Sequence, residues 1–315
     1  MTGYLIGYDQ SVRRLPTVLG WKFDYGLATP CDSFWIKCLW EADDLAPLNA
    51  AVRFQAEEDG ARVFTGVVDE YELHEEQDGR WLEISGRGMA ALLLDNEAEA
   101  ADYDTASWSE IVRRHVTPYG IQVVGGQVPS VDGFSVAYGS SEWQAVYTFV
   151  RYHGGIIPYF DRMGRLVVQP WQDTTEKILD DKTAVTGAVF RYQRYGVLSQ
   201  VMVRDKTRQE VEQVNNYQFQ AVGGQCRRWY TMPGRSSYQA MRYQGQFQLE
   251  QSMAGLEELE ITVPAPFFAA PGELVRVQRT GRGWSGLWRV AQASTGMDEG
   301  GCSTVLTLGR PDLVG

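Results

Sequence analysis

The stretch Phe34-Trp-Ile-Lys-Cys-Leu-Trp40 decides the fold class of this 315-residue chain. The apolar residues Phe34, Ile36, Cys38 and Trp40 fall at every second position, which is the period of a strand with one buried face. Three further apolar runs follow it, and turn residues such as Gly60 and Gly79 separate the later ones. We expect four antiparallel strands joined as hairpins, in a sheet or a small barrel, at residues 34–40, 52–56, 63–73 and 81–85.

The hydrophobic period changes after Gly88, where alanine and leucine predict a short helix over residues 89–95. Ser107 and Glu110 have the spacing of a capping box, and the apolar residues that follow lie on one helix face as far as Val116. A further helix is expected over residues 141–153, followed by a hairpin up to residue 169. Residues 89–185 therefore predict a small α+β domain.

Strand patterns return after residue 185 and continue to the end of the sequence. One polar stretch near residues 238–253 has a possible helical pattern. The chain thus divides into a β-rich range at 1–88, the α+β range at 89–185 and a second β-rich range at 186–315. The strands expected in the last range are 189–192, 199–203, 211–219, 259–263, 274–277, 286–290 and 304–308.

Acidic and basic residues are distributed unevenly along the chain. It holds 40 Asp and Glu against 29 Lys and Arg, a formal net charge of −11. Residues 41–104 carry a net −14 (4 basic, 18 acidic), whereas residues 186–243 carry +6 (9 basic, 3 acidic). The two segments could complement each other between subunits, or they could be solvated faces of separate sheets. The overall acidity argues against a dedicated nucleic-acid binder.

The sequence shows no sign of membrane insertion or secretion. No apolar run approaches the roughly 18 residues of a membrane helix, and the first 20 residues lack the apolar core of a signal peptide. Four cysteines are too few and too scattered for a disulfide scaffold. We expect a protein that folds in a cytoplasm and does not associate with membranes.

Residue patterns that carry known chemistry are absent from the sequence. It has no C-x-x-C, H-E-x-x-H, P-loop or G-x-S-x-G motif. His115 lies on an apolar helix face and is expected in the core or at an interface. Glu72, His74 and Glu76 alternate along one strand and could reach a cation, but an exposed acidic edge is the favoured interpretation. We therefore expect no catalytic residue, no metal and no cofactor.

One group of residues in the basic segment is typical of binding surfaces, because arginines alternate there with aromatic residues. Such a pattern can stack bases and hold phosphates, and it is equally typical of a protein–protein interface. Given the acidity of the whole chain, a protein interface is favoured. The candidate residues are Arg191, Tyr192, Arg194, Tyr195, Arg227, Arg228, Trp229 and Tyr230.

The order of several short motifs resembles a known family. Phe64, Gly66 and Val68 form F-x-G-x-V, Leu82-Glu-Ile-Ser-Gly-Arg-Gly88 follows, and Ala90-Ala-Leu-Leu-Leu-Asp95 comes next. The C-terminal part agrees through residues 271–275, 286–290 and 301–308. This pattern resembles the baseplate hub proteins of contractile phage tails, the Mu-like and late-control protein D group.

The resemblance implies a fold and an assembly. The fold would be a β-rich α+β protein, with two tube-like antiparallel β-barrel domains and a small α/β middle domain. Three copies would form a homotrimeric ring that joins the tail tube protein on one side to the spike protein on the other. Such a subunit would assemble in the host cytoplasm, contact other baseplate proteins and reside in the virion tail. The alternative is a tail-associated peptidoglycan hydrolase, although no lytic domain is visible.

The residues expected to matter structurally are Gly86, Arg87, Gly88 and Asp95. We expect a polar contact between the end of the strand and the helix, with Gly86 or Gly88 at positive φ. The alternative is an ordinary strand–helix junction.

Overall fold

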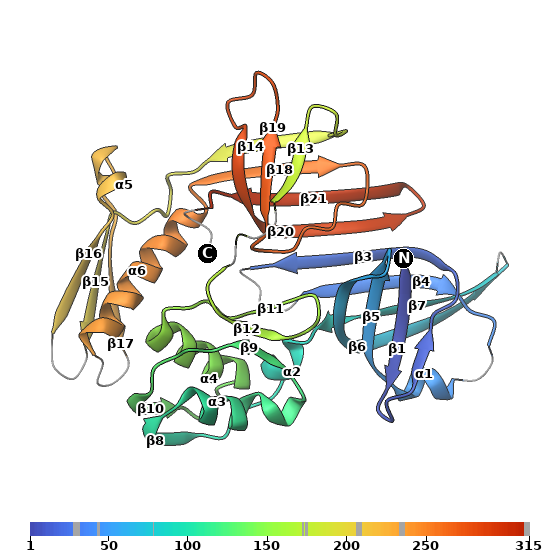
Figure 1. The fold of residues 1–315 in the computed structure, drawn as a ribbon, viewed down its shortest axis with the longest axis horizontal. Coiled ribbons are helices and arrows are strands. Elements are labelled where there is room, and N and C mark those ends of the chain that lie inside the picture. The colour runs from blue at the N-terminus through green and yellow to red at the C-terminus, as the bar shows by residue number, and fades with distance from the viewer. Residues whose placement is uncertain are drawn as a thin grey trace.

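A computed structural model gives the structure of the protein, and it describes residues 1–27, 32–42, 45–77, 79–171, 173, 176–205, 210–232 and 237–311. The molecule is elongated, with a large β-sheet region, a helical region beside it and a small sheet at one end (Figure 1). The expected β-rich α+β class is confirmed. No helix within these ranges is long and apolar enough to cross a membrane.

One 13-stranded sheet contains strands from both β-rich ranges. Its main path has eleven strands, and β13 pairs with β19, which in turn pairs with β20. All pairings are antiparallel except β13 with β19. In path order the strands are β14 (Gly187–Tyr192), β18 (Glu257–Val263), β21 (Gly301–Gly309), β20 (Gly286–Asp298), β3 (Val18–Gly26), β4 (Ser33–Leu39), β7 (Gly79–Gly88), β6 (Ala61–Glu76), β5 (Ala51–Glu58), β1 (Thr2–Gly7) and β2 (Val12–Arg14), with β13 (Glu176–Asp180) and β19 (Leu274–Gln278) beside the path.

The pairing of β3 with β20 connects the two β-rich ranges, with Trp21 opposite Met297 and Tyr25 opposite Ala293. Among the described strands, β14 and β2 end the path: each pairs with one neighbour and they do not pair with each other, so the sheet stays open. The expectation of two closed barrels is therefore not confirmed. The domain boundaries at 88/89 and 185/186 stay predictions.

The alternation in the sequence explains the core of this sheet. Phe34, Ile36 and Cys38 point to one face and are almost completely buried. There the Phe34 ring stacks on Phe54, with 4.1 Å between centroids and 10° between planes. Burying a side chain of this size stabilises the fold by about 1.5–3 kcal/mol. The same cluster includes Trp288 and Leu306 from the C-terminal strands, so both halves of the sheet share one core.

The middle range forms a second core around helices α3 and α4. Ser107 caps α3 as expected, since its side chain accepts a hydrogen bond from the Glu110 amide. The expected hairpin before residue 169 is present as β11 with β12. The elements are α2 (Ala91–Leu94), β8 (Ala101–Ala106), α3 (Trp108–His115), the 3-10 helix η1 (Thr117–Tyr119), β9 (Val123–Gly125), β10 (Val131–Val136), α4 (Glu142–Phe149), the π-helical turn η2 (Val150–Gly154), β11 (Tyr159–Phe160) and β12 (Leu166–Val168).

A third, smaller unit lies at one end of the molecule, where helix α6 packs on one face of a three-stranded sheet (Figure 1). The helix matches the one expected near residues 238–253. The strand expected over 211–219 is wrong in its second half, because Asn216 caps a short helix there. The elements are β15 (Gln200–Asp205), β16 (Val211–Asn215), α5 (Tyr217–Ala221), β17 (Arg227–Met232) and α6 (Tyr238–Ala254), and a short helix α1 (Ala46–Ala50) precedes β5 in the large sheet.

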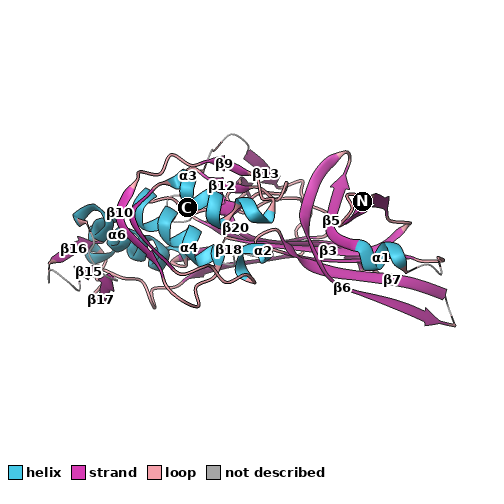
Figure 2. Cartoon of the chain, turned by 90° about the horizontal axis from the view of Figure 1, so that it is seen from below, coloured by secondary structure: helices cyan, strands magenta, loops and turns pink. Residues whose placement is uncertain are grey.

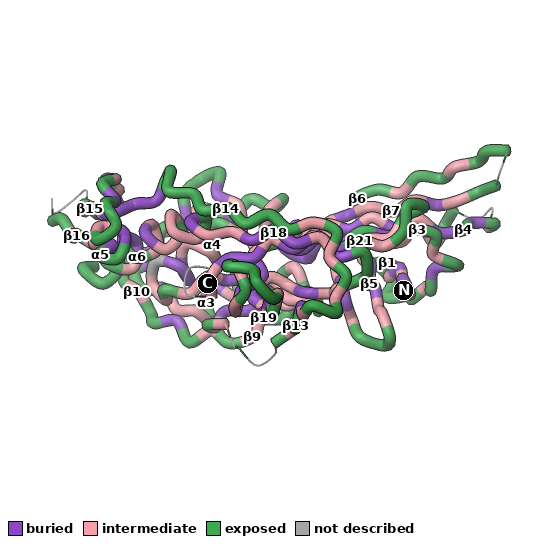
Figure 3. The backbone as a smooth tube through the Cα atoms, turned by 90° about the horizontal axis from the view of Figure 1, so that it is seen from above, coloured by how far each residue is buried: buried purple, intermediate pink, exposed green. Residues whose placement is uncertain are grey.

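Strands β6 and β7 form a ribbon that extends beyond the body of the molecule, at the end opposite the small sheet (Figure 2). The burial pattern follows this arrangement. Buried residues run through the centre of the molecule, whereas the end of the ribbon is mostly exposed (Figure 3).

Candidate functional site

Arg87 lies at the end of β7 and connects this strand to two carboxylates. Its guanidinium donates to both oxygens of Asp95 at 2.7 and 2.9 Å, and to both oxygens of Asp69 at 2.7 and 2.9 Å. Asp95 follows the last residue of α2, so one side chain joins a strand to a helix end. The hydrogen bonds that Arg87 donates to Asp69 and Asp95 raise the pKa of its guanidinium. The bonds from Arg87 also lower the pKa of Asp95.

Asp69 belongs to this junction although the sequence analysis did not include it. The pairing of β6 with β7 shifts register between Val68 and Glu70, which leaves Asp69 at a bulge. Bulges change the direction of a side chain, and here the carboxylate faces Arg87. The sequence signal was an acidic residue that interrupts the apolar part of a strand.

Gly86 and Gly88 have different roles at the junction. The expectation that one of them has positive φ is wrong, because neither is among the glycines with that conformation. Gly86 instead permits close approach, since a Cβ there would lie 2.0 Å from the Val67 carbonyl oxygen. A Cβ on Gly88 would meet its nearest atoms at 3.4 Å. The main chain of Gly88 is held by its amide, which donates to the Asp32 carbonyl at 2.7 Å.

Replacing Arg87 tests how much this junction contributes to the free energy of unfolding. Because the side chain is 38% exposed, water screens both ion pairs, and we expect Arg87→Ala to lower the free energy of unfolding by about 1 kcal/mol. Arg276→Ala is the control, since that arginine is similarly exposed and, among the residues that the structure describes, forms its ion pair with one carboxylate, that of Glu176. Urea unfolding measures both variants. An equal or smaller loss for Arg87→Ala would show that the second carboxylate adds nothing.

Asp32 gives the junction a dependence on pH. Burial raises the pKa of its carboxyl from 3.8 to about 7, although the Gly26 amide donates to it. The folded state therefore holds this proton to higher pH than the unfolded chain does. The stability that the protonated Asp32 carboxyl adds to the free energy of unfolding is complete below about pH 4 and is lost as the pH rises through about 7. We expect Asp32→Asn to flatten the fall in thermal midpoint between pH 5 and 8. An unchanged slope would contradict this assignment.

The candidate interface residues lie on two different sheets. Arg191 and Tyr192 end β14, an edge strand of the large sheet, where Arg191 pairs with Glu258 of β18. The next residues lead away from the sheet, and Arg194 donates to the Val222 carbonyl at 2.6 Å while Tyr195 is almost fully exposed. The other four residues, Arg227, Arg228, Trp229 and Tyr230, lie on β17, an edge strand of the small sheet.

The strand β17 divides its four candidate residues between two faces. Tyr230 packs against the core under α6, whereas Arg227 and Trp229 point to the opposite face. Met202 of β15 pairs with Trp229 on that face and was missing from the sequence analysis. It could have been found only once the register of the parallel pair was known.

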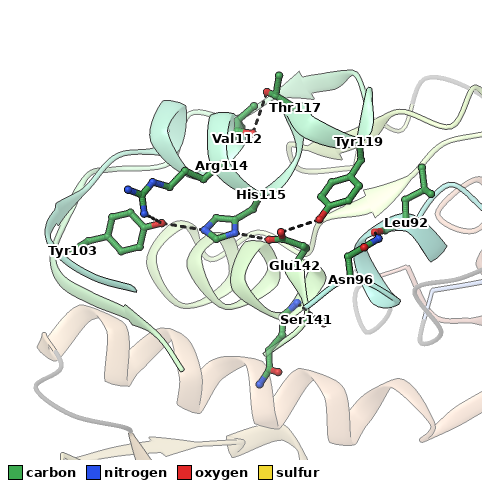
Figure 4. A network of polar contacts seen from close by, with 11 residues as sticks. Leu92, Asn96, Tyr103, Val112, Arg114, His115, Thr117, Tyr119, Ser141 and Glu142 are labelled. Atoms are coloured by element: carbon green, nitrogen blue, oxygen red, sulfur yellow. Dashed lines mark hydrogen bonds and ion pairs between the residues drawn. The ribbon is translucent and has the colours of Figure 1, made fainter. Parts of the chain in front are cut away.

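A buried polar network occupies the centre of the middle range (Figure 4). His115 is buried as expected, and its Nδ1 lies 2.5 Å from Oε2 of Glu142. Tyr119 donates to Oε1 of the same carboxylate at 3.0 Å, and the Tyr103 hydroxyl lies 3.1 Å from His115 Nε2. The network connects α3, η1, α4 and β8, so it holds these elements in place.

The acidic edge expected at Glu72, His74 and Glu76 lies on the β6–β7 ribbon. His74 stacks on Trp81 at 4.9 Å with 4° between ring planes, and its Nε2 lies 3.2 Å from Glu72. Within the described part of the chain, no three His, Cys, Asp or Glu side chains gather in a way that could hold a metal ion.

No protein-family model matches this sequence, and no curated protein matches it. Solved structures do match. The 43 kDa tail protein of prophage MuSo2 from Shewanella oneidensis is similar over 100% of both chains, with 16% identity and a TM-score of 0.78. The tail protein from Neisseria meningitidis MC58 is similar over 99% of this chain and 97% of that one, with 17% identity and a TM-score of 0.80.

A third solved structure is an E. coli component of the type VI secretion system, described as structurally similar to the T4 bacteriophage tail proteins gp27 and gp5. It is similar over 95% of this chain and 77% of its own, with 14% identity and a TM-score of 0.61. At these identities the comparisons establish a shared fold, and that fold extends over essentially the whole chain.

Proposed function

We propose that this chain is a structural subunit of a phage tail or a related contractile injection particle, and that three copies form a hub ring between tail tube and spike. The observation that supports this most is the likeness in fold to two tail proteins, which extends over at least 97% of each chain. The type VI secretion component adds a link to injection machinery, because it is described as similar to T4 tail proteins.

The two faces of the large sheet differ in polarity, as the wall of a channel requires. Opposite the aromatic core, its other face carries polar and charged side chains from consecutive strands. Side chains of both charge signs occur there, and several are carboxylates. The surface is therefore not uniformly basic and would not retain a passing DNA backbone. The residues include Lys22 and Asp24 of β3, Lys37 of β4, Glu83 of β7, Ser294 of β20 and Glu260 of β18.

The edge of the sheet offers a place for assembly. β14 pairs with β18 on one side only, and Val189 and Tyr192 on it are each at least half exposed. An edge strand that is partly apolar and has one side without a partner strand can readily pair with another chain. We propose that this edge is covered in the assembled ring.

Light scattering on the purified chain tests the ring. We expect a species near three times 35.4 kDa, and imaging with the tube and spike proteins should then place it between them. A monomer at all concentrations that neither partner recruits would overturn the proposal.

We also propose that the subunit has no enzymatic activity. The buried Glu142 and His115 bond to each other and to two tyrosines, so they serve the fold rather than a substrate. Zymography on peptidoglycan checks this. Clearing that disappears when one carboxylate is replaced would favour the hydrolase instead.

A further inference from the structure

The small sheet has one face covered by α6 and one face that points away from the rest of the molecule (Figure 1). The strand registers place Trp229 of the edge strand β17 beside Met202 of the central strand β15, midway along both strands. Trp229 is 56% exposed, which is unusual for so large an aromatic residue on a sheet. We call this outer surface the Trp229 face; its members are Gln200, Met202, Arg204, Val211, Gln213, Asn215, Arg227, Trp229 and Thr231.

The charge on the Trp229 face has one sign. Among its members, Arg204 and Arg227 are the charged residues, and they lie on either side of Trp229 along the strands. Asp205 and Glu212 belong to the same strands but point to the α6 side. A tryptophan flanked by arginines is the composition of an interface centre, and it fits a partner that offers carboxylates around an apolar side chain.

The chain itself carries such a surface at its other end. The β6–β7 ribbon (residues 70–83, here the acidic ribbon) holds six acidic residues and one basic residue, a net −5. It projects from the body at the end opposite the small sheet (Figures 2 and 3). Towards its tip, Glu72, His74 and Glu76 lie on one face of the ribbon, together with Trp81. Leu73 lies on the other face, with the ion pair of Glu75 and Arg80.

The acidic ribbon is also held in shape before any contact forms. The stacked His74 and Trp81 rings and the 2.9 Å ion pair between Glu75 and Arg80 link its two strands. An ordered ribbon loses less conformational entropy on docking than a flexible loop would. It can therefore act as a preformed arm.

We infer that the acidic ribbon of one copy docks on the Trp229 face of the next copy. The stacked His74 and Trp81 rings would lie against Trp229 and Met202, with Glu72 and Glu76 near Arg204 and Arg227. Because the two surfaces differ and lie at opposite ends, the contact is head-to-tail, and it forms a closed ring when the rotation between copies closes. This inference rests on the proposed ring and names the surfaces that form it.

Charge swapping tests the contact. Arg227→Glu should weaken self-association about tenfold or more, because it places like charges together at the centre of the contact. Trp229→Ala should weaken it about thirtyfold or more, as at an interface hot spot. Combining Arg227→Glu with Glu76→Arg should restore most of the affinity. Sedimentation over a range of concentrations gives the association constants.

Arg113→Glu is the matched control, since Arg113 is 70% exposed on α3, away from both surfaces. We expect it to leave the oligomer unchanged. Circular dichroism and thermal midpoints confirm that each variant is folded, and Trp229 and Arg227 lie outside the core clusters.

The two possible failures are distinct. A wild-type trimer that Arg227→Glu and Trp229→Ala leave intact, or that Glu76→Arg fails to rescue, would overturn the docking and leave the hub ring standing. A chain that stays monomeric even with tube and spike proteins would overturn both.

Discussion

Gly86→Ala is expected to unfold at a much lower urea concentration than the wild type, with a loss of about 3 kcal/mol or more in the free energy of unfolding. A Cβ at this position would lie 2.0 Å from the Val67 carbonyl oxygen and 2.6 Å from the Phe34 ring. The first contact is with backbone in the neighbouring strand, so it can be relieved only if β6 moves away from β7. That movement would break the sheet where both strands cover the aromatic core.

Gly88→Ala is the control for this prediction, because it lies two residues away on the same strand. Its Cβ would meet Asp32 at 3.4 Å, an ordinary contact, and its φ is not positive. We expect a loss below about 1 kcal/mol. Equal urea midpoints for the two variants would show that β6 yields to the new methyl group, and close approach would then not explain Gly86.

Local patterns in the sequence were sufficient for many elements of the fold. The period-two run at residues 34–40 is β4, and the capping box at Ser107 begins α3. The strand β3 was not predicted, although Trp21, Phe23 and Tyr25 alternate in it. Its partner β20 is about 270 residues away, and such a pairing depends on tertiary packing that no short window contains.

The candidate sites show the same limit. Arg87 and Asp95 are eight residues apart, so a local motif was enough to place them together. Asp69 joins them through a register shift between strands, which the sequence does not specify. The arginine and tyrosine pattern was visible as one group, but it divides between β14 and β17 because the chain leaves one sheet and enters another. Alternation along β17 then separates Trp229 from Tyr230.

Glu142→Ala should have the second large effect, a loss of about 3 kcal/mol or more in the free energy of unfolding. The carboxylate is buried, and it faces His115 Nδ1 and the Tyr119 hydroxyl on its two oxygens. Without it, His115 Nδ1 remains buried and loses this partner, the half-buried Tyr119 hydroxyl loses its acceptor, and the methyl group leaves a cavity between α3 and α4. Chemical unfolding with near-ultraviolet circular dichroism measures the loss.

Glu110→Ala provides the comparison, since this glutamate also lies in the first turn of a helix but pairs with Arg113 and Arg114 at the surface. We expect a loss below about 1 kcal/mol. A second readout is specific to the network. Burial, together with the bond to Glu142, raises the pKa of Tyr119 to about 12, so spectrophotometric titration of Glu142→Gln should find one tyrosine that ionises at lower pH. If Glu142→Ala costs no more than Glu110→Ala, water replaces the carboxylate, and the network is not what holds the helices together.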